Sequence, residues 1–258
     1  MASSRPETLP METRTNKRTE PAALGILGWE AGNEDTLGQL EQLPGDIAHP
    51  DTFSFPVLYR RVTGACYETV VNNPSREVLA ANIEAAQEMQ AAGVGAVLTN
   101  CGFNAIFQRE LAQAVDVPLF TSSLIQVPMV HRMLSSGQVV GIITADQEHL
   151  TPAHLRGVGI TDLSSVIIRG IEKTGEFSRI RAHPDCPLDA GKFIDEVVLV
   201  GQQMIAQRPQ VGAVVLECTD LPPAAAMLRR ELGLAVFDIV TLAHMVHEAL
   251  LGDRWGPK

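Results

Sequence analysis

The sequence predicts an α/β protein made of two similar halves, each with a parallel sheet. Two observations carry this prediction. Residues 94–101 and 211–218 repeat one pattern, an apolar run rich in β-branched residues that ends in polar residues and a cysteine. Apolar runs of this kind also alternate with stretches of helical periodicity, and such alternation favours parallel sheets covered by helices.

The repeat extends beyond the two cysteine-containing runs. The matching segments, first half against second, are 25–28 and 141–144, 107–111 and 228–232, and 117–121 and 234–238. Internal self-similarity outweighs any single motif in choosing an architecture. The expected division is a disordered tail over residues 1–21, a first α/β domain over 22–122 that is completed by 236–258, and a second α/β domain over 123–235.

The composition describes a soluble globular chain with an ample core. Of 258 residues, 45% are apolar and 19% are charged, and the net charge of −10 disfavours nucleic acid and anionic membranes as partners. No apolar run reaches the roughly 18 residues of a membrane span, and the first 21 residues lack the apolar segment of a secretory signal. The four cysteines form no CxxC pair, so we expect reduced thiols and a cytoplasmic location. We also expect a homo-oligomer that acts on a small carboxylate-bearing substrate.

The predicted strands are short apolar runs bounded by glycine, proline or polar residues. In order they cover residues 23–27, 55–59, 94–98, 117–120, 139–143, 164–169, 211–216 and 235–238.

The predicted helices lie between these strands. They cover residues 76–92, 104–114, 124–134, 149–156, 188–208, 221–232 and 239–251. Ser75 is a suitable N-cap for the first of them, and Pro222 stands in an opening turn, where proline is tolerated. Residues 31–54 and 172–187 are predicted as loops.

Several polar residues stand at the carboxyl ends of predicted strands, where open parallel sheets bind ligands. They are Gly28 with the turn after it, Cys101, Thr121, Thr144 and Cys218. If the halves face each other, these groups converge on one cleft. Thr121 and Ser122 also precede a predicted helix, an arrangement that suits an anion, and Arg60 lies near a strand end, where it is a candidate carboxylate ligand.

Two thiols at matching positions suit proton transfer on opposite faces of one carbon. One cysteine takes the proton as a thiolate and the other returns one as a thiol, so a neighbouring group or a helix N-terminus has to lower the pKa of a thiol from about 8.5. We predict Cys101 and Cys218 as the catalytic pair. The polar candidates beside them are Asn100, Thr219 and Asp220, with Thr144 as an auxiliary residue.

Other groups are assigned less specific roles. Glu217, if ionised near a thiol, would raise the thiol pKa, so it is expected to point away or to bind a substrate cation. Cys66 and Cys186 are read as ordinary packed cysteines. The sequence has no zinc-ligand spacing, GxGxxG motif or P-loop, and cofactor-free chemistry is the simplest interpretation.

At the segments 99–101 and 217–219 the chain resembles the aspartate/glutamate racemase superfamily, over about residues 24–250. The resemblance implies two pseudo-symmetric flavodoxin-like domains with the active site in the cleft between them. It also implies cofactor-independent proton transfer between two cysteines on a small carboxylate-bearing substrate. Thr121 and Ser122 then correspond to donors to the substrate carboxylate, and Gly28 and Trp29 occupy the first-strand loop that contacts substrate.

The chain departs from glutamate-specific members of that superfamily. Asp220 stands where they carry a histidine, and Gly28-Trp29-Glu30 replaces an aspartate-serine pair. Segments 44–47, 55–57, 101–103 and 216–223 resemble a group that includes the algal Alma-type dimethylsulfoniopropionate lyases.

Three functions follow from these patterns, in order of preference. The first is a cofactor-independent racemase or epimerase. The second is a carbon–sulfur lyase that releases dimethyl sulfide and acrylate after the same proton removal. The third is a non-catalytic ligand-binding protein.

Overall fold

The computed structural model describes residues 10–13, 23–30 and 36–250, and its strands form two sheets. The first sheet has the order β1-β3-β2-β4-β5 and the second the order β7-β6-β8-β9. Their bounds are β1 Met11–Thr13, β2 Leu24–Trp29, β3 Val57–Val62, β4 Ala96–Thr99, β5 Leu119–Phe120, β6 Val139–Thr144, β7 Val166–Gly170, β8 Val211–Leu216 and β9 Ala235–Phe237.

The two sheets share one topology. Without β1, each places its second strand at one edge, followed by its first, third and fourth strands, and all of these pairs are parallel. In the first sheet Leu27 pairs with Thr99, and in the second Ile143 pairs with Leu216. The duplicated α/β fold predicted from the repeat is confirmed.

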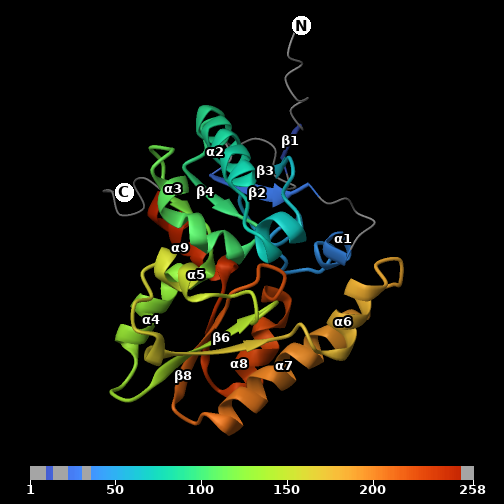
Figure 1. Cartoon of the computed structure of the whole chain (residues 1–258), viewed down its shortest axis with the longest axis vertical. Coiled ribbons are helices and arrows are strands. Elements are labelled where there is room, and N and C mark those ends of the chain that lie inside the picture. Colours follow the sequence, from blue (N-terminus) through green and yellow to red (C-terminus); the bar gives the residue numbers. More distant parts are fainter. Residues whose placement is uncertain (1–9, 14–22, 31–35, 251–258) are drawn as a thin grey trace, which may run out of the picture.

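Helices cover both faces of each sheet (Figure 1). Their bounds are α1 Thr36–Leu40, α2 Arg76–Ala91, α3 Gln108–Ala112, α4 Val127–Met133, α5 Pro152–Gly157, α6 Gly175–Ala182, α7 Ala190–Gln207, α8 Ala225–Leu232 and α9 Ile239–Leu250. Side chains of α2 and α3 pack in one core with those of the first sheet and with Val140 and Ile142 of β6. Side chains of α7 and α8 form a separate core on the other face of the second sheet.

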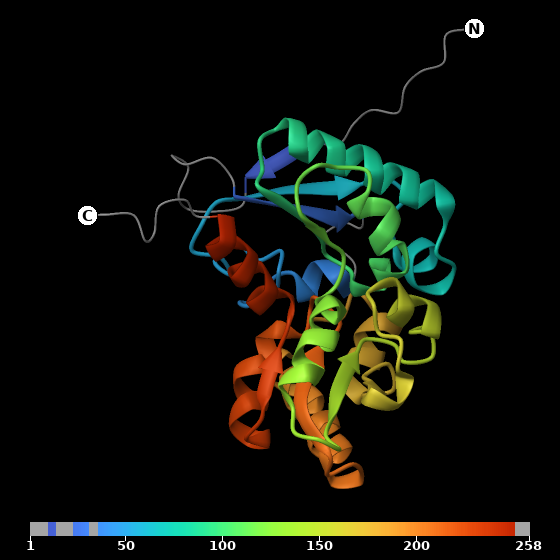
Figure 2. The same ribbon diagram turned by 90° about the vertical axis from the view of Figure 1, so that its left-hand side faces the viewer.

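The last helix returns to the first half of the molecule. Ile239, Leu242 and Ala243 of α9 pack with Leu24 and Ile26 of β2, and Figure 2 shows α9 running back from the second sheet toward the first. This packing ties the end of the described chain to the first half. Residues 251–258, including the predicted final residue of this helix, lie outside the described residues.

The structure contains elements that the sequence pattern does not predict. Helices α1 and α6 occupy segments expected to be loops, and residues Glu68–Asn72 form one π-helical turn, η1. In the predicted disordered tail, Met11–Thr13 pairs antiparallel with β3, so the prediction is wrong at these residues, and the rest of the tail lies outside the described ranges. These three residues form backbone hydrogen bonds with β3, which would otherwise be an edge strand. Such pairing depends on the backbone, so the side-chain pattern of a short polar segment does not predict it.

Within the described part of the chain, no helix combines the length and the apolar character needed to cross a membrane.

Candidate active site

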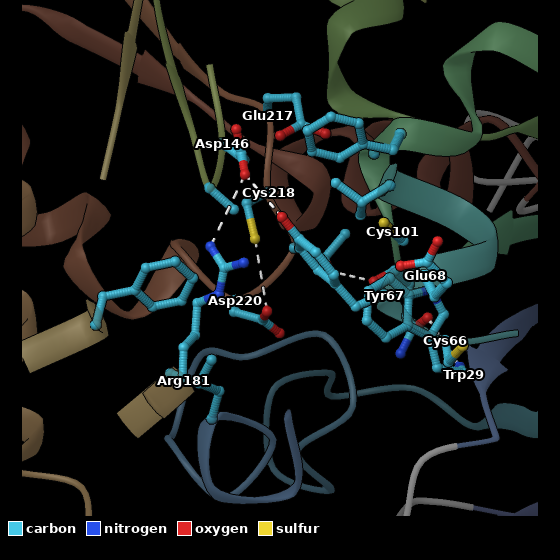
Figure 3. Close-up of a pocket in the computed structure, with 18 of the residues that line it drawn as sticks. Trp29, Cys66, Tyr67, Glu68, Cys101, Asp146, Arg181, Glu217, Cys218 and Asp220 are labelled. Atoms are coloured by element: carbon cyan, nitrogen blue, oxygen red, sulfur yellow. Dashed lines mark hydrogen bonds and ion pairs between the residues drawn. The ribbon is translucent and has the colours of Figure 1, made fainter. Parts of the chain in front are cut away.

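A cavity of about 480 Å³ lies between the two halves, and both Cys101 and Cys218 line it. Its first-half wall includes Trp29, Cys66 and Tyr67, and its second-half wall includes residues of the β6, β8 and α6 regions. In the view of Figure 3 the two cysteines lie apart, Cys218 beside Asp146 and Asp220 and Cys101 toward Glu68. The convergence expected from the repeat therefore occurs in one cavity.

The third strand of each sheet positions its cysteine. Cys101 comes two residues after β4 and Cys218 two residues after β8, so each thiol lies beyond the carboxyl end of a strand that adjoins the first strand of its sheet. Such positions, where the strand order reverses, form crevices in doubly wound sheets. Each sulfur also accepts a backbone hydrogen bond, from Phe103 in the first half and from Asp220 in the second.

The residue before each cysteine is held in a matching way. The Asn100 side-chain oxygen accepts a hydrogen bond from the Trp29 backbone N–H, over 3.2 Å. The Glu217 carboxylate accepts one from the backbone N–H of Ala145, which follows β6 as Trp29 ends β2. In both halves, therefore, the side chain before the cysteine accepts a backbone hydrogen bond from the end of the first strand. This side chain is an amide, Asn100, in the first half and a carboxyl group, Glu217, in the second.

A buried polar network supports the Cys101 loop. Arg61 donates to the Trp29 carbonyl and to Glu41, over 2.8 Å in each case. Tyr59 donates to Glu41 over 3.1 Å and accepts from the Asn100 amide over 3.0 Å. This network orients Trp29 and Asn100 through strand β3, a role that the sequence alone does not reveal.

The two halves are also joined directly at the cysteines. Thr219, which follows Cys218, donates its hydroxyl hydrogen bond to the carbonyl of Asn100, which precedes Cys101. Both residues line the cavity and are almost fully buried. This contact holds the two cysteine loops in a fixed relation.

Both thiols are poor acids in this environment. Burial raises the pKa of the Cys101 thiol well above its usual value, and the Glu217 carboxylate raises it further. Burial likewise raises the pKa of Cys218, and the charges of Asp220 and Glu217 add to the effect. At neutral pH both cysteines are therefore thiols, so a thiolate has to be formed with the help of a nearby proton acceptor.

Glu217 is fully buried beside both cysteines. One carboxylate oxygen, Oε2, accepts from Thr144 over 2.7 Å, and the other, Oε1, has no hydrogen-bond partner among the described residues. Burial raises its pKa to about 7. Of the two expected roles, pointing away from the thiols is wrong, because Glu217 lines the same cavity and its charge acts on both cysteines, whereas binding of a substrate cation stays a prediction.

Gly102 leaves room for the Glu217 carboxyl group. A Cβ at Gly102 would overlap with both Glu217 Oε1 and the Glu217 backbone oxygen, so the loop after Cys101 would have to shift. We expect Gly102→Ala to destabilise the protein by about 1–3 kcal/mol, the usual cost of overpacking, and to lower turnover. Chemical denaturation and steady-state rates measure both effects, and Gly191→Ala, at an exposed position of α7 where the atom nearest the added Cβ is 3.6 Å away, controls for adding a methyl group. Unchanged stability and turnover in Gly102→Ala would show that this packing is unimportant.

Some predicted site residues do not line the cavity. Thr121 is fully buried, and both its backbone N–H and its hydroxyl donate to Gln108 over 2.8 Å. Ser122 is also fully buried and caps the 3₁₀ turn Ser123–Gln126 by accepting from the Leu124 N–H. The two residues therefore cap a buried turn and do not form the expected anion-binding site, because the turn Ser123–Gln126 packs between the two halves.

Three further predicted residues lie behind the cavity wall. Arg60 forms an ion pair with Glu88 on α2 and does not line the cavity, because neighbouring strand residues point to opposite faces. Gly28 packs against the Tyr59 hydroxyl, which leaves no room for a side chain. Thr144 contacts Glu217 from behind.

Several residues that line the cavity were not predicted from the sequence. Arg181 lies on the unpredicted helix α6, where its guanidinium is 3.8 Å from Asp146 and 4.4 Å from the centroid of the Tyr67 ring. Tyr67 donates to Asp146 over 2.8 Å. Burial raises the pKa of Asp146, but hydrogen bonds from Tyr67 and His149 outweigh this effect and lower it.

Cys66 is a third thiol in the cavity wall, although its sequence context suggested an ordinary packed cysteine. A hydrogen bond with the Thr69 hydroxyl, 3.4 Å from its sulfur, lowers the pKa of Cys66. The position of Cys66 depends on the π-helical turn η1, which no periodicity in the sequence predicts.

Comparisons with known proteins agree with this architecture. A family model described as Asp/Glu/Hydantoin racemase matches residues 24–245. The chain therefore belongs to the Asp/Glu/hydantoin racemase family.

Curated relatives and solved structures are similar over most of the chain. The dimethylsulfoniopropionate lyase of Durusdinium sp. clade D is 30% identical over 207 residues, which make up 78% of this chain and 68% of that protein. Dimethylsulfoniopropionate lyase 7 of Emiliania huxleyi is 29% identical, over 82% of this chain and 64% of that one. A mutant of arylmalonate decarboxylase associated with a sulfate ion shares the fold, with a TM-score of 0.57, 18% identity, and coverage of 91% of this chain and 94% of that one. The family match and the curated relatives place the chain among enzymes of the racemase and lyase type.

Proposed function

We propose that the chain is a cofactor-independent carbon–sulfur lyase that removes a proton from the carbon next to a carboxylate and expels dimethyl sulfide from a sulfonium acid. The observation that carries the proton-transfer step is the position of Cys101 and Cys218 in one cavity between the halves. Elimination is favoured over racemisation because the curated relatives at 27–30% identity are dimethylsulfoniopropionate lyases.

The proposed reaction conserves atoms and charge. The Cα–H bond of the substrate breaks, and its proton passes to a cysteine thiolate. The electron pair forms the Cα–Cβ double bond of acrylate while the Cβ–S bond breaks, and sulfur leaves as neutral dimethyl sulfide. The thiol then returns its proton to solvent, so one turnover converts the zwitterion into acrylate, dimethyl sulfide and H⁺.

Arg181 is the proposed ligand of the substrate carboxylate. Among the described residues that line the cavity it is the only Lys or Arg, and a guanidinium matches the planar geometry of a carboxylate. Binding there would replace part of the ion pair with Asp146. A substrate held at Arg181 is presented from the second-half wall toward both cysteines.

The remaining wall suits a sulfonium cation. Its aromatic side chains are Trp29, Tyr67, Phe103 and Phe177, and its carboxyl groups are Glu68, Asp146, Glu217 and Asp220. Aromatic faces attract cations by about 0.5–2 kcal/mol, and carboxylates add a favourable charge interaction. The cavity therefore offers one site for an anion and a wide surface for a cation.

We expect Arg181→Gln to raise KM for the sulfonium acid about 10–100-fold with a smaller change in kcat, because a charge-assisted hydrogen bond contributes about 1.5–3 kcal/mol. Steady-state kinetics measure the two parameters separately. Arg230→Gln, which alters an exposed arginine of α8 outside the cavity, is the matched control. An unchanged KM in Arg181→Gln would remove this residue from the substrate site.

Headspace analysis tests the proposed lyase activity. The full chain is incubated with dimethylsulfoniopropionate, and dimethyl sulfide and acrylate are measured against a reaction without protein. The expected result is equal molar formation of both products. Absence of both from a folded protein that leaves the substrate intact would contradict the lyase proposal.

Racemisation is the second candidate, and one feature of the site favours it. Elimination needs a single base, whereas inversion of a carbon needs one group on each side, and the cavity has a cysteine from each half. Incubation of single enantiomers of amino acids and hydantoins, followed by chiral chromatography, tests this candidate. Inversion without dimethyl sulfide formation would make the chain a racemase, and tight binding without either reaction would indicate a ligand-binding protein.

A further inference from the structure

The two cysteines have matching backbone positions but different neighbours. The Cys218 sulfur donates a hydrogen bond to Asp220 Oδ2, over 3.5 Å. At the equivalent position in the first half, two residues after Cys101, stands Phe103. Only the second half therefore places a carboxyl group at this position beside its thiol.

A second carboxyl group lies behind Asp220. Asp46 is fully buried, and its Oδ1 accepts from the Ala48 N–H over 2.7 Å, whereas its Oδ2 accepts no N–H or O–H hydrogen bond from the described residues. The Asp46 side chain is in hydrogen-bond contact with that of Asp220. Two carboxyl groups form such a bond only when one of them holds a proton.

Burial identifies which group holds that proton. It raises the pKa of Asp46 well above its usual range, and the charge of Asp220 and their mutual hydrogen bond raise it further. Asp46 is fully buried whereas Asp220 is partly exposed and lines the cavity, so the proton of the pair is assigned to Asp46, which donates to Asp220. Asp220 in turn faces the cavity and the Cys218 thiol.

The loop that carries Asp46 packs against the second half of the molecule. Gly45 has a φ of +98°, a conformation that glycine adopts without strain, and a Cβ at this position would lie 3.3 Å from the Cα of Pro223. Pro223 follows Asp220 by three residues. The turn therefore lies directly against the segment that contains Asp220.

We propose that Asp46, Asp220 and Cys218 form a hydrogen-bonded trio in which Asp220 takes the Cys218 proton, so that Cys218 rather than Cys101 is the base. The assignment of a base deepens the lyase proposal and rests on it, whereas the trio itself concerns the chain without substrate. Asp46 acts as a positioning residue that holds Asp220 toward the sulfur.

The proton balance of the trio is simple. At rest it contains two protons, one on Asp46 and one on Cys218, and one negative charge on Asp220. When the proton of the Cys218 S–H bond moves to Asp220 Oδ2, a new O–H bond forms and the charge moves to sulfur. Asp46 keeps its proton, so a thiolate forms without release of a proton to solvent. Coupled groups of this kind titrate as a unit.

The pH dependence of cysteine alkylation tests the trio without any substrate. The full chain is treated with iodoacetamide at a series of pH values, and the modification rate of each cysteine is followed by peptide mass spectrometry. Cys101 is the internal reference. Other titratable groups act on the trio, Glu41 beside Asp46 and Glu217 and Cys101 beside Cys218, and Asp146 and Arg181 line the same cavity.

We expect the Cys218 profile to stay flat or to rise slightly as the pH falls from about 8 to 6, because the trio forms its thiolate without releasing a proton and because protonation of Glu217 near pH 7 removes a charge that raises the Cys218 pKa. The Cys101 rate should instead fall about tenfold per pH unit below the pKa of its thiol. In Asp220→Asn the Cys218 rate should fall as steeply as that of Cys101. A steep fall in the unaltered chain, or a flat profile that persists in Asp220→Asn, would overturn the proposal.

Asp46→Asn tests the second carboxyl group. The amide keeps an acceptor for Ala48 and a donor for Asp220, so the flat Cys218 profile should remain within about threefold of its original height. The infrared carbonyl band of a neutral carboxylic acid should lose intensity in this variant. An unchanged band, or loss of the flat profile, would contradict the role of Asp46. If the alkylation results hold while no substrate reacts, the trio stands and the lyase proposal fails.

Discussion

Replacement of Cys218 by serine is expected to lower kcat/KM for the sulfonium acid by about 10²–10⁴-fold, the usual contribution of a positioned acid or base, and replacement of Cys101, which lines the same cavity but is not the base, is expected to lower it less. A serine hydroxyl is a far weaker acid than a thiol, so it does not supply the corresponding anion near neutral pH. The loss should be greater in Cys218→Ser, because the trio assigns the base to Cys218. Initial rates of dimethyl sulfide formation measure both losses.

Two other cysteines provide comparisons for this result. Cys186→Ser, which alters a thiol outside the cavity, should leave the rate unchanged. Cys66 lines the cavity and has a lowered thiol pKa. A large loss in Cys66→Ser combined with full activity in Cys101→Ser and Cys218→Ser would show that Cys66, and not the proposed pair, is the catalytic thiol.

Glu217→Gln is expected to stabilise the protein at high pH and to have less effect at low pH. The pKa of Glu217 is raised by burial from 4.5 to about 7, so the folded state binds the proton more tightly than the unfolded chain does. Stability from this group is present below pH 4.5 and is lost as the pH rises through about 7. Complete ionisation costs on the order of 3 kcal/mol at 1.36 kcal/mol per pH unit, and glutamine avoids this cost.

Thermal or chemical unfolding of Glu217→Gln and the unaltered chain at pH 5 and about pH 8.5 measures this effect as a double difference. Other groups with raised pKa values, such as Asp46 and Asp238, act in both proteins and largely cancel. The stability advantage of the variant should grow with pH. An advantage that is constant or that shrinks with pH would show that Glu217 is not a buried acid with a raised pKa.

The strands could be predicted because their sequence signals are strong and local. The apolar runs that contain Gly25, Gly141 and Val214 give both the strand positions and the internal repeat, and the repeat gives the shared sheet order. Helix α6 was missed because its buried residues, such as Phe177 and Ile180, lie in a polar segment that is rich in charge. Its amphipathic pattern is short, and the packing of the second half stabilises it.

The cysteine pair could be predicted because duplication places Cys101 and Cys218 at equivalent strand ends. The residues around the cysteines depend on which face of a strand each side chain occupies. The apolar and polar pattern around Arg60 and Arg61 does not show which of the two arginines faces the site. Arg61 contacts the Trp29 loop, whereas Arg60 pairs with Glu88. Arg181 and Tyr67 come from a helix and a turn whose positions depend on long-range packing, so local signals did not identify them. The carboxyl group of Asp46 reaches Asp220 across the two halves, 174 positions along the chain.

Deuterium labelling tests most directly whether a cavity cysteine breaks the bond between hydrogen and the carbon next to the carboxylate. Dimethylsulfoniopropionate carrying deuterium at that carbon is compared with the unlabelled acid, under conditions where both react in separate single-turnover experiments. We expect a slower reaction of the labelled acid, with the reaction of both acids slowed by about 10²–10⁴-fold in Cys218→Ser. Equal rates for the two acids together with full turnover in Cys101→Ser and Cys218→Ser would contradict this expectation.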